Sequence, residues 1–252
     1  MAGEQGAVAA IHSAAKELKL PTFRAQAEPL AASALKSGQS YLEYLAELLT
    51  REVEDRQDRK RARRIAEAKF PRLKRLADFD FTESAVKPAV IAALAKGAYL
   101  ESGEPVIFLG DSGTGKTHLL LGLGLAACEM GMSVRYTTCA KLVNELVEAA
   151  DERALQRAVA RYGRYDLLCL DEVGYIHTDV RGAELLFQII TEREEKASIA
   201  LATNFPFTEW GTVFSDPRLA SAVVDRVTFK ATIIETGTNS YRLRTSKAKM
   251  LN

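Results

Sequence analysis

One octapeptide constrains this chain more than any other stretch, because it fits the phosphate-binding pattern G-x-x-x-x-G-K-[ST]. Its glycines remove the Cβ atoms that would keep consecutive backbone N–H groups from wrapping a phosphate. Lys116 supplies a mobile cation for the β- and γ-phosphates, and Thr117 supplies a hydroxyl ligand for Mg²⁺. The octapeptide consists of Gly110, Asp111, Ser112, Gly113, Thr114, Gly115, Lys116 and Thr117.

The stretches on either side of the octapeptide support the same interpretation. Residues 105–109 form an apolar run typical of a strand, and residues 118–130 form an apolar run typical of a helix that begins at His118. A helix in this position directs its positive N-terminal end at the same phosphates. We therefore predict that the octapeptide and His118 bind a nucleoside triphosphate together with Mg²⁺.

A second motif follows about 55 residues downstream. Residues 167–170 are apolar, which indicates a buried parallel strand, and the acids Asp171 and Glu172 follow directly. The carboxyl end of such a strand is where open α/β sheets bind ligands. We expect Asp171 to hold the Mg²⁺ shell opposite Thr117 and so to be part of the nucleotide site. We expect Glu172 to orient and deprotonate the attacking water as a general base.

Two weaker signals have alternative interpretations. The apolar run 198–204 ends in the polar residue Asn204, which either contacts the γ-phosphate or its water or is simply a turn asparagine. Phe79 and Phe81, about 30 residues before the octapeptide, either flank an adenine ring or pack in the core.

The remaining pattern predicts alternating strands and helices over the rest of the chain. Further strands are expected at 133–137 and 231–235, with a possible hairpin arm at 238–243. Further helices are expected at 140–150, 152–162, 182–196 and 216–226.

Residues 1–70 have a different pattern, which predicts a separate helical domain before an ATPase domain at 71–252. Helices are expected at 7–19, at 23–36 with an interruption near Pro29, and at 40–64, where apolar residues form one stripe. Residues 56–75 include ten basic residues and only two acidic ones. This run is either a solvated helix face or a contact for the DNA backbone. The DNA-binding candidates are Arg56, Arg59, Lys60, Arg61, Arg63, Arg64, Lys74 and Arg75. The basic tail 242–252 is a further stretch that could touch DNA.

Composition excludes several classes of protein. The net charge is +1, so affinity for nucleic acid must come from local clusters of basic residues. The three cysteines are widely spaced in apolar runs, which favours reduced core thiols over a disulfide or metal site. The sequence has neither an apolar stretch of about 18 residues nor a basic-then-apolar signal pattern, so we expect a cytoplasmic protein.

Taken together, these motifs resemble those of the IstB-like family of AAA+ ATPases, the ATP-binding helper proteins of insertion-sequence transposition. The resemblance covers nearly the whole chain. It rests on the stretches GDSGTGKTH, LLCLDEVGY, LATNFPFTEW, VVDRV and GTNSYRL, and on LKLP, YLEYLAELLTREVEDR and AKFPRLKRLADFDF near the N-terminus.

The resemblance implies an α/β P-loop fold and an assembly. The implied sheet has five parallel strands in the order 5-1-4-3-2, behind an N-terminal helical domain. Because few residues follow the fifth strand, we expect no C-terminal helical lid. AAA+ proteins form rings or filaments with ATP at subunit boundaries. Asn204 matches the sensor-1 position, and Arg226 matches the arginine finger that a neighbour inserts, with Arg218 as the second candidate. The alternative for Arg226 is an intramolecular salt bridge with Asp225 or Asp216.

The implied function is ATP-dependent regulation of transposition. ATP binding would drive self-assembly on duplex DNA and its remodelling, the assembly would recruit and stimulate the transposase of the same element, and hydrolysis would disassemble it. A related alternative is a DnaC-like loader of the replicative helicase, which would prefer single strands and use stacking aromatic residues. A third is a small-molecule kinase, which would need a lid and an acceptor pocket. The basic run lacks interleaved aromatics, which favours duplex DNA.

Overall fold

The computed structural model describes residues 2–175, 179–214, 216–238 and 240–241. The chain divides into two compact units, residues 1–63 and residues 64–252. The division falls within the long helix α3 (Tyr41–Ala68), near the expected domain boundary at 70/71. The predicted basic tail 242–252 and part of the predicted hairpin arm lie outside the described residues.

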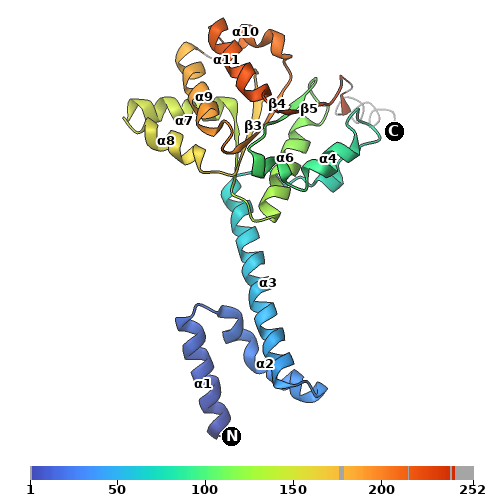
Figure 1. The fold of residues 1–252 in the computed structure, drawn as a ribbon, viewed down its shortest axis with the longest axis vertical. Helices are drawn as coiled ribbons and strands as arrows, with labels where there is room; N and C mark the ends of the chain where they lie inside the picture. The colour runs from blue at the N-terminus through green and yellow to red at the C-terminus, as the bar shows by residue number, and fades with distance from the viewer. Residues whose placement is uncertain (1, 176–178, 215, 239, 242–252) are drawn as a thin grey trace, which may run out of the picture. The chain divides into compact units, whose positions relative to one another are not determined.

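The first unit contains α1 (Ala2–Glu17), α2 (Pro21–Ser37) and the first part of α3 (Figure 1). Its small core consists of Ala27, Leu30 and Leu48, with Phe23 and Tyr44 packed against it. The predicted interruption near Pro29 was wrong, because α2 continues through this proline. A proline removes only one helical hydrogen bond, and burial of the nearby residues Ala27 and Leu30 offsets that loss.

The start of α2 is stabilised from α3. The residue before α2, Leu20, has no side chain that could cap the helix. Glu52 of α3 is almost completely buried, and its carboxylate accepts hydrogen bonds from the backbone N–H groups of Thr22 (2.9 Å) and Phe23 (3.4 Å). These N–H groups have no partner inside the helix, so Glu52 serves as a cap that is distant in sequence.

The second unit is built on a five-stranded parallel sheet. The strands are β1 (Val106–Leu109), β2 (Val134–Thr138), β3 (Leu167–Val173), β4 (Ser198–Thr203) and β5 (Thr232–Glu235). They lie in the order β2-β3-β4-β1-β5, and every neighbouring pair is parallel. This is the predicted order 5-1-4-3-2 read from the other edge, so the predicted fold is confirmed.

Helices cover both faces of the sheet, because side chains of successive strand residues point to opposite faces (Figure 1). In β3, Cys169 contributes to the core beneath α6 (Lys116–Glu129), and Leu170 contributes to the core on the other face. The first face also packs against the short helices α4 (Pro88–Leu94) and α5 (Ala98–Ser102), which the sequence did not predict. The second face is covered by α7 (Cys139–Asp151), α8 (Leu155–Gly163), α9 (Val180–Arg193) and α11 (Pro217–Thr228). The remaining elements are the 3-10 turns η1 (Leu76–Asp78) and η2 (Phe207–Glu209), and α10 (Trp210–Val213).

The cysteines are core residues, as predicted. Cys128, Cys139 and Cys169 are buried free thiols. Burial raises the pKa of Cys128 and of Cys139 to about 12. Within the described ranges, we find no group of three or more metal-binding side chains and no helix long and apolar enough to cross a membrane.

Candidate nucleotide site

The octapeptide forms the loop between β1 and α6, and two of its glycines stand where a side chain would be strained and would clash. Gly113 has a φ of +85° and Gly115 a φ of +98°, a region that favours glycine. A Cβ atom at Gly115 would lie 2.5 Å from the ring of Phe79, and one at Gly113 would overlap the hydroxyl of Ser240. A side chain at either position would therefore collide with a residue that packs against the loop.

The loop is held in place from the C-terminal side of the chain. The hydroxyls of Thr114 and Thr236 lie 2.6 Å apart, and the backbone N–H of Tyr241 donates to the Gly113 carbonyl over 3.1 Å. Lys116 Nζ donates to the carbonyls of Gly110 (2.6 Å) and Asp111 (2.7 Å), which places its ammonium group over the loop. The loop therefore has both the backbone curvature and the cation that a polyphosphate requires.

The two motifs meet at Asp171, at the carboxyl end of β3. Its buried carboxylate accepts from the Thr117 hydroxyl at 3.3 Å on Oδ1 and from the Tyr136 hydroxyl at 2.9 Å on Oδ2. The Glu172 backbone N–H also donates to Oδ1, over 2.9 Å. Burial, and then the nearby Asp171 carboxylate, raise the pKa of Tyr136, so this phenol remains a proton donor. A hydroxyl and a carboxylate oxygen are the ligand types that Mg²⁺ prefers, so Thr117 and Asp171 fit the predicted metal role.

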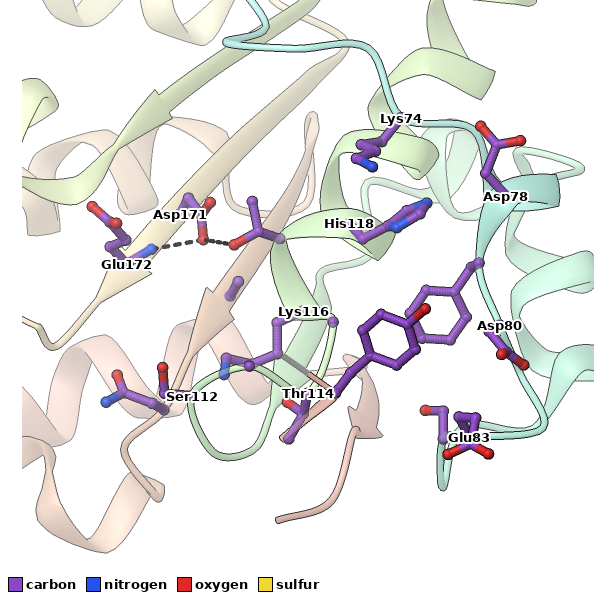
Figure 2. Close-up of a pocket in the computed structure, with 18 of the residues that line it drawn as sticks. Lys74, Asp78, Asp80, Glu83, Ser112, Thr114, Lys116, His118, Asp171 and Glu172 are labelled. Atoms are coloured by element: carbon purple, nitrogen blue, oxygen red, sulfur yellow. Dashed lines mark hydrogen bonds between the residues drawn. The ribbon is translucent and has the colours of Figure 1, made fainter. Parts of the chain in front are cut away.

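Glu172 has an unusual backbone for a strand residue. Its φ is +58°, and the pairing of β3 with β4 shifts in register between Leu170 and Val173. Asp171 is buried while the side chain of Glu172 is exposed in the same cavity, so neighbouring acids have different environments (Figure 2). Strained backbone of this kind is concentrated at functional sites.

A cavity of about 430 Å³ lies over the loop, within the size range of ligand pockets. It brings together most of the predicted site: Ser112, Gly113, Thr114, Gly115, Lys116, Thr117, His118, Asp171, Glu172 and Asn204. Gly110 and Asp111 belong to the loop and hold Lys116 through their carbonyls.

The opposite wall of the cavity comes from the segment before β1, and the sequence patterns predicted little of it. Figure 2 shows Asp78, Asp80 and Glu83 on the side opposite Asp171 and Glu172. Phe79 stacks edge-on against His118 at 5.3 Å, and His118 Nε2 lies 2.9 Å from the Arg75 carbonyl. The aromatic segment around Phe79 was the only sequence signal for this wall.

The arginine candidates do not line this cavity. Arg226 donates from Nε to Glu194 Oε2 over 3.0 Å, and its guanidinium lies 4.5 Å from the centre of the Phe187 ring. Its ionic partner is thus Glu194 and neither Asp225 nor Asp216. The side chain of Asp216 instead caps the start of α11. Arg218 is exposed on the first turn of α11.

The basic run is partly neutralised within the molecule. Arginines of this run form ion pairs with acids: Arg56 and Arg59 with Glu52, Arg61 with Asp58, Arg64 with Glu67, and Arg75 with Glu129.

The remaining DNA-binding candidates are Lys74, Lys60 and Arg63. Lys74 lies in the wall of the nucleotide cavity, a position that the sequence did not indicate. Lys60 is exposed and has no ion-pair partner among the described residues. Arg63 is also exposed.

A family model described as IstB-like ATP binding protein matches residues 13–249. This chain belongs to that family. It is 36% identical over 232 residues to an insertion-sequence ATP-binding protein of Sinorhizobium fredii, covering 91% of this chain and 78% of the relative. It is also 36% identical over 228 residues to the ATP-binding protein of insertion sequence IS21 from Pseudomonas aeruginosa, covering 90% and 86% of the two chains.

Two solved structures share the fold of the second unit of this IstB-like chain. DnaA from Aquifex aeolicus bound to AMPPCP has a TM-score of 0.50 and 25% identity, over 64% of this chain and 50% of that one. DnaI has a TM-score of 0.55 and 17% identity, over 65% and 90% of the two chains. The DnaI likeness concerns the fold alone, and this chain spans about half the length of the DnaA chain.

Proposed function

We propose that this IstB-like protein is an ATPase that regulates DNA transposition by assembling on DNA. The observation that carries the ATPase assignment is the contact of Thr117 with Asp171, beside the exposed carboxylate of Glu172. A phosphate loop, a metal-binding pair and a general base then share one cavity. The bound AMPPCP of the related DnaA structure supports ATP as the nucleotide.

The proposed division of labour follows from these positions. Lys116 neutralises charge on the β- and γ-phosphates, and Thr117 and Asp171 hold Mg²⁺, which supplies further charge neutralisation at the phosphates when bound. Glu172 accepts a proton from the attacking water, and Asn204 orients that water or the γ-phosphate. The remaining loop residues bind phosphate through backbone N–H groups.

Assembly would couple hydrolysis to DNA. Because Arg226 and Arg218 lie outside the cavity of their own chain, each is suited to complete the site of a neighbouring subunit. Exposed basic residues such as Lys60, in the proposed helical domain 1–70, would contact DNA phosphates with little base readout. The assembly would remodel duplex DNA and recruit the transposase of the same element, and hydrolysis would release it.

The test is ATP-dependent sizing of Glu172→Gln with and without a duplex of about 50 base pairs, long enough for many phosphate contacts. We expect large complexes on duplex DNA that require ATP and weaken as salt rises, because counterion release drives such contacts. Lys116→Ala is the matched control and should not assemble.

The other outcomes separate the alternatives. Assembly only on single strands or on a replicative helicase would support a helicase loader and contradict the transposition role. A monomer that binds ATP and ignores DNA would contradict both, and would favour a small-molecule kinase.

A further inference from the structure

The carboxylate of Asp171 could point in more than one direction, and only one direction serves the proposed metal site. Its Oδ1 atom lies 3.3 Å from the Thr117 hydroxyl, so Oδ1 is the oxygen on the side of the phosphate loop. Its Oδ2 atom accepts from the Tyr136 hydroxyl at 2.9 Å. Asp171 is only 4% exposed, so each of its oxygens needs a partner inside the protein.

The sheet explains why Tyr136 can reach this carboxylate. Tyr136 lies on β2, and its register partner on β3 is Cys169. Because strand side chains alternate, Cys169 and Asp171 point to the same face of β3. Tyr136 therefore lies diagonally across from Asp171 on the α6 side, a spacing that a long aromatic side chain spans. The ring of Tyr136 packs near that of Phe70, with 6.3 Å between ring centres. This packing limits the orientations that the phenol can adopt.

From this geometry we propose that Tyr136 is the positioning residue that orients Asp171 toward Thr117 for Mg²⁺ binding. The inference rests on the proposed ATPase function and adds a residue to it. Tyr136 does not line the nucleotide cavity, so it acts through Asp171 and does not touch the nucleotide. Side chains that are hydrogen-bonded to a metal ligand affect metal affinity because they fix the orientation of that ligand.

The experiment measures binding of a non-hydrolysable ATP analogue as Mg²⁺ is titrated, so the readout does not depend on turnover. In Tyr136→Phe, the ring and its packing remain and only the hydroxyl is lost. We expect the Mg²⁺ concentration at half-saturation to rise about tenfold or more, the effect typical of such partners. Binding of the analogue in EDTA should be unchanged.

Tyr162→Phe is the matched control. Tyr162 is buried whereas Tyr136 is partly buried, and the Tyr162 hydroxyl also donates to a carboxylate, that of Glu145 at 2.7 Å. It lies on α8, away from the nucleotide cavity. The loss of a phenol hydroxyl that donates to a carboxylate is thus common to both variants, and only Tyr136→Phe should shift the Mg²⁺ dependence.

A double variant separates positioning from general loss of stability. Asp171→Asn alone should remove most of the Mg²⁺ dependence, and adding Tyr136→Phe to it should change little more, since the phenol acts through this carboxylate. Additive effects would overturn the proposal, as would an unchanged Mg²⁺ half-saturation in Tyr136→Phe. If the parent chain itself bound the analogue equally well with and without Mg²⁺, the proposed metal site would fail together with this inference.

Discussion

Arg226 and Glu194 form an ion pair, with 3.0 Å between Nε and Oε2, and Phe187 lies beneath the guanidinium. Both charged side chains are about one-third exposed, so the pair is worth at most about 1 kcal/mol. An arginine held this weakly fits the proposed role, in which it exchanges Glu194 for a phosphate bound by a neighbouring subunit.

We therefore expect Arg226→Ala to bind ATP normally and to lose most DNA-stimulated turnover. The free energy of unfolding should fall by only about 1 kcal/mol. Turnover is measured by phosphate release with and without duplex DNA. Glu194→Gln is the control, because it breaks the same pair and leaves Arg226 in place, and its turnover should persist. Normal turnover in Arg226→Ala would remove this residue as the finger and direct attention to Arg218.

Gly115→Ala should weaken ATP binding about tenfold or more, equivalent to about 1.4 kcal/mol or more. The residue has a φ of +98°, and a Cβ there would press on the Phe79 ring. The affinity is measured with a fluorescent ATP analogue, beside a thermal unfolding curve. Adding Phe79→Ala should recover only part of the loss, because the positive φ remains. Gly211→Ala has free space around its Cβ and should change stability by less than about 0.5 kcal/mol.

Glu52→Ala should destabilise the first unit by about 1–2 kcal/mol, the usual cost of losing a helix cap. It leaves the N–H groups of Thr22 and Phe23 at the start of α2 without their carboxylate partner. Amide hydrogen exchange is the measurement, with faster exchange expected in α2 and no change around the nucleotide loop. Glu47→Ala removes an exposed pair with Arg51 and is the control. Equal exchange in the two variants would contradict the capping role.

The cysteines give a prediction that depends on pH. Because burial raises the pKa of Cys128 and Cys139 to about 12, their thiolates form in the folded chain only as the pH approaches that value. Alkylation at pH 8 should therefore be slow in the native protein and complete in denaturant, as counted by mass spectrometry. Rapid native alkylation of either residue would contradict the burial described above.

The nucleotide site was predictable to the extent that it is local in sequence. The loop residues, Asp171 and Glu172 follow from short motifs whose chemistry requires those residue types in that order. Tyr136 and the wall around Asp80 were not predictable from residues alone, because they depend on which strands are neighbours and on how one segment folds back over α6. The sheet order came from the family resemblance, since no local pattern encodes it.

The first unit shows the same limit. Apolar spacing predicted its three helices, but the cap on α2 comes from Glu52, about 30 residues away. The short helices α4 and α5 were missed because each has too few residues to display a helical period.

The hydrogen bonds that link the phosphate loop to Thr236 and Tyr241 also have a consequence for synthesis of the protein. The loop is made early, but the hydroxyl of Thr236 and the N–H of Tyr241 that hold it are added much later. The central strand β1 likewise waits for both β4 and β5. A nascent chain on the ribosome therefore carries a complete phosphate-binding motif long before it has a formed pocket, and nucleotide can help fold this unit only after Tyr241 has been added.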